Sequence, residues 1–382
     1  MKTFHCGVCQ SLIFFENSRC LQCGAQLAFV AGQNELLALS EGQDGLWRTP
    51  VGSRLEAQTF KLCANYTDHQ LCNWAVAGGD AHMQCESCRL TSTIPNLSLS
   101  GRKEAWAKLE TAKRRLIYAI LTLPLPLIGK REDGIRGLEF RFLSDDAAVS
   151  GDQDRILTGH DNGVITINVA EADDAYREAQ RQLQREPYRT LLGHFRHEIG
   201  HYYWDQLIAN SERLQEFRQL FGDERADYQQ ALDAHYNQGP PENWADNFIS
   251  AYASMHAWED WAESWAHVMH MIDALETAQS LGLSIKPSRR DEPTLTIPAS
   301  PLRARVRDFE QLIQEWSTLT YVLNNLTRGL GLADAYPFVL SEATVRKLKF
   351  VCESMTAPAS QGMDRPIPDA SVAAATPEPA QA

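Results

Sequence analysis

Two histidines four residues apart, with a glutamate directly after the first, are the feature that most constrains this chain. They lie in His197-Glu198-Ile199-Gly200-His201. Residues four apart lie one above the other on a helix, so His197 and His201 can direct two imidazoles at one ion. Glu198 is one residue further round, where it can reach a water on that ion. This H-E-x-x-H spacing is typical of zinc peptidases, with two zinc ligands and a general base.

A third metal ligand must come from another part of the chain, because a catalytic zinc takes three protein ligands and one water. The metzincin pattern is excluded, since it needs Gly where Trp204 stands and His where Leu207 stands. A better source is segment 254–270, in which polar residues recur every three or four positions among tryptophans. These residues are His256, Glu259, Glu263, His267 and His270. A helix this aromatic is expected to be buried, and a buried polar stripe needs a partner such as a metal.

Residues 259–263 resemble the E-x-x-A-D/E-x-x-A pattern of the gluzincins, the group that includes thermolysin. In that group the first acid binds zinc, and the second, one turn later, braces the first histidine. The resemblance implies Glu259 as the third ligand and Glu263 as the partner that fixes a histidine tautomer. Glu263 as the direct ligand is the main alternative, and His256 follows both.

Eight of the nine cysteines precede residue 89, which predicts metal binding rather than disulfides in a reducing compartment. The first set consists of two C-x-x-C knuckles, Cys6 with Cys9 and Cys20 with Cys23. Two such knuckles give a tetrahedral four-cysteine zinc site, the zinc-ribbon plan. Because so small a segment has too little core to fold alone, we expect this zinc to be structural.

A second, more loosely spaced set comprises Cys63, Cys72, Cys85 and Cys88. It predicts a second structural zinc, although only the last two cysteines form a knuckle. His69 and His82 lie nearby in the sequence and could replace a weak ligand. Buried free cysteines are the alternative interpretation.

Cys72-Asn73-Trp74 and the run from Cys85 to Ser98 resemble the amino-terminal part of a bacterial family of putative zinc-binding metallopeptidases that begin with a zinc ribbon. Further matching segments are 197–204, 239–244 and 249–270. The resemblance covers most of residues 1–350 and implies a zincin fold and zinc binding, without a substrate. The chain departs from the family at Ala257, where we expect proline, and this affects only the start of the third-ligand helix.

The formal net charge of −13 argues against general binding to nucleic acids or anionic membranes, which requires a basic surface. The chain opens on Met1-Lys2-Thr3-Phe4-His5-Cys6, without the apolar core of a secretory signal. The longest apolar run, 116–129, contains two prolines and is shorter than the roughly 20 residues of a membrane-spanning helix. We therefore expect a cytoplasmic protein.

The predicted fold class is α+β, with one or more zinc-ribbon modules followed by a mainly helical zincin-like metallopeptidase domain that contains a small sheet. We place the zinc-ribbon region with its two four-cysteine sites at 1–98 and the metallopeptidase domain at 99–356. The tail at 357–382, rich in Pro and Ala, is expected to be disordered because it has little to bury.

Within the second domain, helices are expected at 102–121, 171–186, 205–237, from about Trp244 onwards, at 302–328 and at 341–355. Alternating residues predict strands at 137–143 and 163–169, and Asn162-Gly163 predicts a hairpin turn before the second. We expect residues 164–169 to be an edge strand that binds a peptide substrate by strand addition, with an ordinary paired strand as the alternative. Residues 280–301 are expected to form a loop at the mouth of the cleft.

The predicted activity is zinc-dependent hydrolysis of a peptide or protein substrate. Zinc on His197, His201 and Glu259 would activate a water, and Glu198 would carry its proton to the leaving amine. The oxyanion needs a hydrogen-bond donor, and five candidates stay open: Tyr202, Tyr203, Tyr252, His256 and His267.

The alternative is a non-catalytic adaptor, in which the zinc ribbon binds a protein partner and the H-E-x-x-H site holds a structural metal. Glu198 argues against it, because a structural site has no need of a base. A third interpretation combines the two: the ribbon recruits a target that the peptidase domain cuts.

Overall fold

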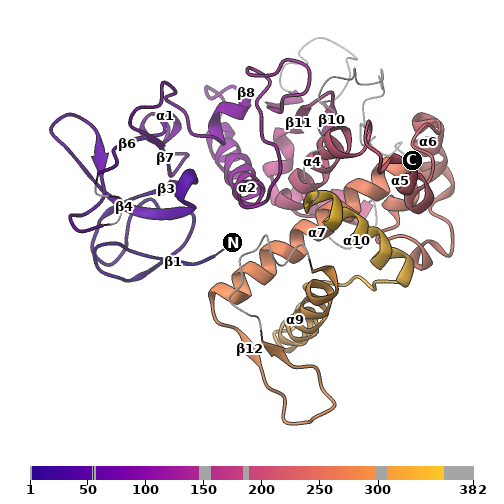
Figure 1. Ribbon diagram of the computed structural model, residues 1–382. Helices are drawn as coiled ribbons and strands as arrows, with labels where there is room; N and C mark the ends of the chain where they lie inside the picture. Colours follow the sequence, from indigo (N-terminus) through magenta and orange to yellow (C-terminus); the bar gives the residue numbers. More distant parts are fainter. Residues whose placement is uncertain are drawn as a thin grey trace.

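The computed structural model describes residues 2–53, 55, 57–145, 156–183, 189–296 and 308–356. A module of strands at the amino-terminal end adjoins a larger, mainly helical part (Figure 1). The expected disordered tail at 357–382 lies outside the described residues. None of the described helices combines the length and the apolar character needed to cross a membrane.

The amino-terminal module consists of a short hairpin and a closed five-stranded barrel. In the hairpin, β1 (Phe4–His5) pairs with β2 (Leu12–Ile13). The barrel strands are β3 (Gln26–Val30), β4 (Glu35–Glu41), β5 (Trp47–Arg48), β6 (Phe60–Leu62) and β7 (Trp74–Ala77). Parallel pairing of β3 with β7, with Phe29 opposite Trp74, closes the barrel. The first cysteine set surrounds the hairpin, and the second surrounds α1 (Ala64–Thr67) and β7.

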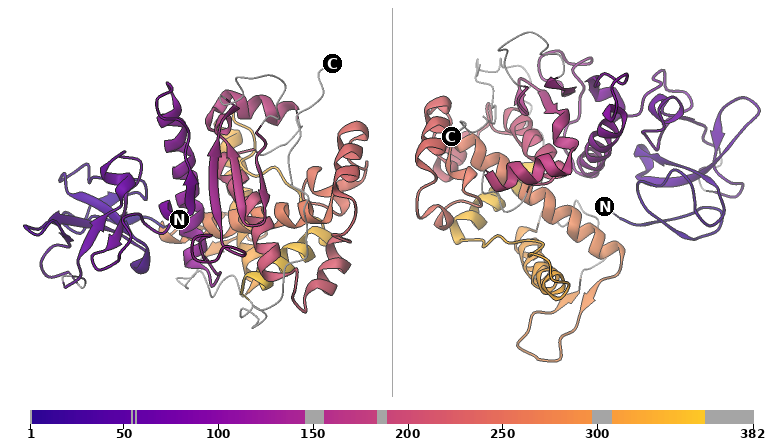
Figure 2. Two further views of the ribbon diagram at one scale, coloured as in Figure 1. Left: turned by 90° about the horizontal axis from the view of Figure 1, so that it is seen from above. Right: turned by 180° about the vertical axis from the view of Figure 1, so that it is seen from behind.

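The long helix α2 (Arg102–Thr122) joins this module to the rest of the protein, and Figure 2 shows it standing between them. Tyr118 on α2 is fully buried and lies against Phe15 and Phe29 of the module, with ring centroids 5.2 and 5.7 Å away. Trp74 continues this aromatic cluster, 4.7 Å from Phe29. The module is therefore packed firmly on α2 rather than attached by a loose linker.

A four-stranded sheet lies beside α2, in the order β10-β11-β9-β8. Its strands are β8 (Thr91–Thr93), β9 (Glu139–Leu143), β10 (Gly159–Asp161) and β11 (Val164–Asn168). The predicted strands and the hairpin turn are present. Asn162 and Gly163 have φ angles of 48° and 83°, and a Cβ on Gly163 would lie 2.3 Å from the Gly137 carbonyl oxygen.

The expectation that residues 164–169 form the edge of the sheet is wrong. The Asn162-Gly163 turn folds β10 back onto β11, whose other side pairs in parallel with β9. The edge strand beside the H-E-x-x-H helix is therefore β10, and β11 is an ordinary paired strand.

The helices of the larger part include α3 (Asp174–Leu183), α4 (Leu191–Leu207), α5 (Leu214–Phe221), α6 (Tyr228–Gln238), α7 (Ala257–Ser280), α9 (Phe309–Gly329) and α10 (Glu342–Thr356). Segment 205–237 was expected to be helical throughout, but it holds the end of α4 and two further helices. The region predicted as loop, 280–301, contains the paired strands β12 (Ser284–Ile285) and β13 (Leu295–Thr296), and residues 297–301 lie outside the described part.

The helix expected from about Trp244 begins only at Ala257. Short 3-10 turns at Trp244–Asp246 and Tyr252–Ser254 precede it. The α-helix starts where His256 supplies a cap, since its Nδ1 accepts a hydrogen bond from the Trp258 amide at 3.2 Å.

Close contact between α4 and α7 forms the centre of the larger part. A Cβ on Gly200 of α4 would lie 3.1 Å from both the Ala262 Cα and the Trp265 Cβ of α7. The indole of Trp261 also donates to the Gly200 carbonyl oxygen at 2.8 Å. Glycine at this position therefore lets the two helices approach closely, which places their polar residues face to face.

Candidate active site and metal centres

His197 and His201 on α4 meet Glu259 on α7, and their ligand atoms lie within 4.8 Å of one another. The His197 Nε2 is 2.9 Å from Glu259 Oε2 and 3.3 Å from the His201 Nε2. The His201 Nε2 is 3.5 Å from Glu259 Oε1. Two ligand atoms of a tetrahedral zinc, each about 2.05 Å from the ion, are separated by about 3.3 Å. The spacing of these atoms therefore fits a zinc ion.

The Glu259 carboxylate supports the same conclusion. It is buried, and among the described residues no hydrogen-bond donor satisfies its Oε2. Burial raises the pKa of Glu259, but His201 and His197 lower it more, so the carboxyl group stays charged. A buried carboxylate oxygen without a donor is costly unless a cation faces it, and an ion between the three side chains would do so.

Glu263 lies behind His197 and not at the ligand position. Its Oε1 is 2.8 Å from the His197 Nδ1, and its Oε2 accepts a hydrogen bond from the Ser250 hydroxyl at 2.7 Å. This contact keeps the proton on Nδ1 and leaves the Nε2 lone pair for a metal. The geometry thus favours Glu259 as the third ligand and Glu263 as its support.

The third candidate ligand, His256, is used elsewhere. Its Nδ1 caps α7, and its Nε2 donates to the Ala226 carbonyl oxygen at 3.1 Å. With both ring nitrogens engaged, His256 stabilises the start of the helix that carries Glu259.

Glu198 has the surroundings that a general base needs. The side chain is buried, and its Oε2 lacks a hydrogen-bond partner among the described residues. Burial raises the pKa of Glu198 above its ordinary value, and the neighbouring imidazoles of His197 and His201 offset this only in part. A carboxylate whose pKa is shifted towards neutrality accepts and returns a proton more readily at physiological pH.

Of the five expected oxyanion donors, Tyr252 lies beside the site, with its ring centroid 6.0 Å from that of His197. Three of the others have different contacts. The Tyr203 hydroxyl donates to the Pro126 carbonyl oxygen, the His267 Nδ1 contacts the Tyr336 hydroxyl, and His256 caps α7. Tyr202 packs on the Tyr203 ring.

Two residues near the metal ligands were missed by the sequence analysis. Tyr228 on α6 donates its hydroxyl proton to Glu259 Oε1 at 2.9 Å. His160 on the edge strand β10 stacks on His201 with a centroid separation of 6.3 Å, and it accepts a hydrogen bond from the Gly163 amide. Neither belongs to a spacing motif, so only the folded chain brings them to the site.

Both cysteine sets also have the geometry of a metal centre, each with four sulfurs that lie within 4.8 Å of one another. Cys6 and Cys23 are 3.7 Å apart, Cys9 and Cys20 are 3.5 Å apart, and Cys72 and Cys85 are 3.8 Å apart. A tetrahedral zinc with bonds of about 2.3 Å separates two sulfurs by about 3.8 Å. These distances are far too long for disulfides, which have S–S distances of about 2.05 Å.

The two histidines proposed as replacement ligands are not in the second set. His69 packs on the Trp106 ring at 5.1 Å, and His82 contacts Asp80 Oδ1 at 2.9 Å. Four sulfurs complete the second centre without them.

Comparison with known proteins agrees with this organisation. A family model described as putative zinc-binding metallo-peptidase matches residues 102–354, and a zinc-ribbon domain model matches residues 3–99. Uncharacterized proteins of Mycobacterium tuberculosis and Mycobacterium bovis are 44% identical over 352 residues, which cover 92% of this chain and 94% of theirs. No solved structure matches significantly.

Proposed function

The chain belongs to the family of putative zinc-binding metallo-peptidases, and from this premise we propose that it hydrolyses peptide bonds in a peptide or protein substrate. The observation that carries the proposal is the position of Glu198. A buried carboxylate whose Oε2 has no hydrogen-bond partner among the described residues adjoins a group of three metal-ligand side chains. A purely structural metal site has no use for such a base.

We propose one catalytic zinc on His197, His201 and Glu259, and one structural zinc on each cysteine set. A zinc ion at the first of these sites would supply a water of lowered pKa and polarise the scissile carbonyl. The surrounding side chains do the remaining work. Glu263 and Ser250 hold the His197 ring in one tautomer and orientation.

Glu198 would accept a proton from the attacking water and return it to the leaving amine. Tyr252 is the phenol beside the site that could donate to the developing oxyanion, whereas Tyr228 already donates its one hydroxyl proton to Glu259 Oε1. Burial and the charge of Glu259 raise the pKa of both phenols, so both keep their protons. Hydrogen-bond donors that are already in place as the charge develops are the most effective stabilisers of such a transition state.

A cytoplasmic location accords with the proposed metal centres. Zinc thiolate sites need reduced cysteines, which the cytosol maintains. The eight amino-terminal cysteines are unpaired in two clusters and have no disulfide.

One observation favours a second role for the amino-terminal module. Leu21, inside the second knuckle, is 95% exposed, and Val8, inside the first, is 57% exposed. Apolar side chains on a zinc ribbon are suited to contact a protein, so the module could recruit the substrate that the helical part cleaves.

The experiment that tests the proposal compares zinc-loaded wild type with Glu198→Gln on a broad peptide library. Glutamine keeps the size of the side chain and removes the base, so cleavage should fall by at least about 100-fold while zinc content is unchanged. Glu216→Gln, a substitution on the exposed surface of α5, is the matched control. Equal behaviour of wild type and Glu198→Gln would contradict the proposed hydrolysis and favour an adaptor.

A further inference from the structure

The second cysteine centre is enclosed by protein, and this sets it apart from the first. Cys63, Cys72, Cys85 and Cys88 are all buried. In the first centre, by contrast, Cys23 is exposed and Cys9 is partly exposed. Water can therefore compensate charge at the first centre, whereas the second centre depends on the protein around it.

That compensation is substantial, because four thiolates around one divalent zinc carry a net charge of about −2. Backbone amides provide part of it. The Trp74 amide donates to the Cys72 sulfur, and the Cys85 amide donates to the Cys63 sulfur, both at 3.4 Å. These donors are neutral, so the charge itself still needs a cation nearby.

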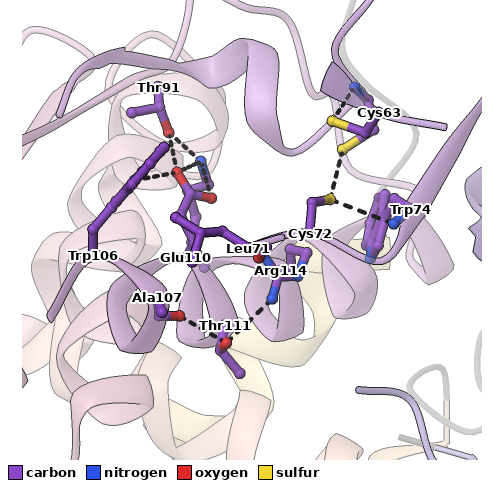
Figure 3. A network of polar contacts seen from close by, with 12 residues as sticks. Cys63, Leu71, Cys72, Trp74, Thr91, Trp106, Ala107, Glu110, Thr111 and Arg114 are labelled. Carbon is purple, nitrogen blue, oxygen red and sulfur yellow. Dashed lines mark hydrogen bonds and ion pairs between the residues drawn. The ribbon is translucent and has the colours of Figure 1, made fainter. Parts of the chain in front are cut away.

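Arg114 on α2 is placed to be this cation (Figure 3). Its side chain is only 6% exposed, and its Nη1 donates to the carbonyl oxygen of Leu71, the residue before Cys72, at 2.5 Å. Its Nη2 donates to the Thr111 hydroxyl at 3.1 Å. Both of these partners are neutral, so they orient the guanidinium group without balancing its charge.

The nearest acid on the same helix has another cation. Glu110 lies one turn before Arg114, and its carboxylate is 2.9 Å from the Lys113 ammonium group, with both side chains almost fully buried. Thr91 and Trp106 also donate to this carboxylate. The charge of Glu110 is thus shared with Lys113, which leaves the second cysteine centre, reached through Leu71 beside Cys72, as the other site of negative charge near Arg114.

The electrostatics of Arg114 support this pairing. Burial lowers the pKa of the guanidinium group, but Cys72, followed by Glu110, Cys88 and Cys85, raises it more. The net pKa is therefore above its ordinary value. Three of these four groups are members of the second cysteine centre.

We propose that Arg114 is the counter-charge of the second cysteine centre and a positioning residue for its metal. Arg114 belongs to α2, which lies against the H-E-x-x-H helix α4. Metal binding at this centre therefore fastens the amino-terminal module to the helix that supports the candidate active site. The inference does not depend on peptide hydrolysis, so an inactive protein would leave it intact.

The test uses the full zinc-loaded chain and two substitutions that separate charge from hydrogen bonding. Arg114→Gln keeps a donor for the Leu71 carbonyl but removes the charge, whereas Arg114→Lys keeps the charge. Arg115→Gln is the matched control, since the neighbouring Arg115 is 40% exposed and pairs with Glu16 on the surface. Zinc release to an excess of the chelator 4-(2-pyridylazo)resorcinol is followed over time, and Cys85→Ser identifies the phase that belongs to the second centre.

We expect Arg114→Gln to release the second-centre zinc about 10 to 100 times faster than wild type, as losses of residues that support metal ligands commonly do. The midpoint of acid-induced release should also move to higher pH, because thiolates without a nearby cation take up protons more easily. Arg114→Lys should stay near the wild-type rate and midpoint, and Arg115→Gln should be unchanged.

Wild-type release from Arg114→Gln would overturn the proposal. Equally fast release from the Gln and Lys variants would overturn it too, because the charge that lysine keeps would then not retain the metal. If Arg114→Gln fails to fold while Arg114→Lys folds with wild-type release, the charge is again the cause. Failure of both variants to fold would contradict the specific role in metal retention.

Discussion

Glu263 Oε1 lies 2.8 Å from the His197 Nδ1, on the opposite side of the imidazole from Glu259, whose Oε2 is 2.9 Å from Nε2. Two acids one turn apart on α7 thus address the two nitrogens of one histidine. Nε2 faces the other ligand side chains, whereas Nδ1 contacts the Glu263 carboxylate, which also accepts a hydrogen bond from the Ser250 hydroxyl. This arrangement favours Glu259 as the metal ligand and Glu263 as the residue that supports His197.

Glu263→Gln should weaken zinc binding at the H-E-x-x-H site without abolishing it. The amide oxygen can still accept the Nδ1 proton, but the negative charge that strengthens the histidine ligand is lost. Replacing such a supporting residue commonly lowers metal affinity by about 10- to 100-fold. Competition with a chelator would measure the change, with Glu216→Gln as the control, and an unaltered affinity would mean that Glu263 does not support the ligand.

Tyr228→Phe should lower zinc affinity at the H-E-x-x-H site, as measured by competition with a chelator. The substitution removes only the hydroxyl that donates to Glu259 Oε1 at 2.9 Å, and loss of a residue that supports a metal ligand commonly lowers metal affinity by about 10- to 100-fold. Tyr321→Phe, at an exposed phenol on α9, is the control. If zinc affinity is unchanged, the Tyr228 hydroxyl does not support the metal ligand.

Gly200→Ala should destabilise the protein by about 1–3 kcal/mol, the usual cost of overpacking. The new methyl group would lie 3.1 Å from Ala262 and Trp265, so α4 and α7 would have to move apart. Gly329→Ala is the matched control, because a Cβ there meets no atom within 4 Å. Urea unfolding of both variants measures the difference, and a neutral Gly200→Ala would show that the two helices can separate without cost.

His267 should make the protein less stable in mild acid. Burial lowers its pKa from 6.5 to about 4, against a smaller opposing effect of Glu263. The unfolded chain therefore binds a proton at a pH where the folded chain does not. The stabilisation that depends on a neutral His267 is fully present above about pH 6.5. As the pH falls towards 4 it is lost, and the free energy of unfolding decreases by at most about 3 kcal/mol.

The test of this pH dependence compares urea unfolding of wild type and His267→Gln at pH 7 and pH 4.5. The variant should lose less stability over this interval. His82→Gln, at a largely exposed imidazole, is the control. Because acid also releases zinc from every variant, the informative quantity is the difference between variants, and parallel curves would exclude His267 as a cause.

The parts of this structure that short spacings determine could be predicted from the sequence. A C-x-x-C knuckle and an i, i+4 pair of histidines place ligand atoms together by local geometry alone. The choice of Glu259 over Glu263 needed the resemblance to gluzincins, because both acids lie on the same face of α7. Asn162-Gly163 likewise predicted a hairpin from local backbone preference.

The features that depend on distant contacts could not be predicted. The edge position of β10 is set by the pairing of β11 with β9, which the sequence of the hairpin does not reveal. The barrel closes through β3 and β7, which are far apart in the chain. Tyr228 reaches Glu259 only because the chain folds back after the break at Gly239-Pro240-Pro241 and brings the start of α7 to the start of α6.

The most direct test of the central claim is the metal content of wild type, His197→Ala, Glu259→Ala and Glu263→Ala by mass spectrometry, each purified without added zinc. The account predicts three zinc ions per chain in wild type, one for each group of ligand residues. It predicts two zinc ions per chain in His197→Ala and in Glu259→Ala. In Glu263→Ala it predicts that the third ion is still bound, but with lower affinity. If Glu259→Ala keeps the third ion and Glu263→Ala loses it, the third ligand is Glu263. If His197→Ala keeps all of its zinc, the H-E-x-x-H segment does not hold a metal and the proposed peptidase site is wrong.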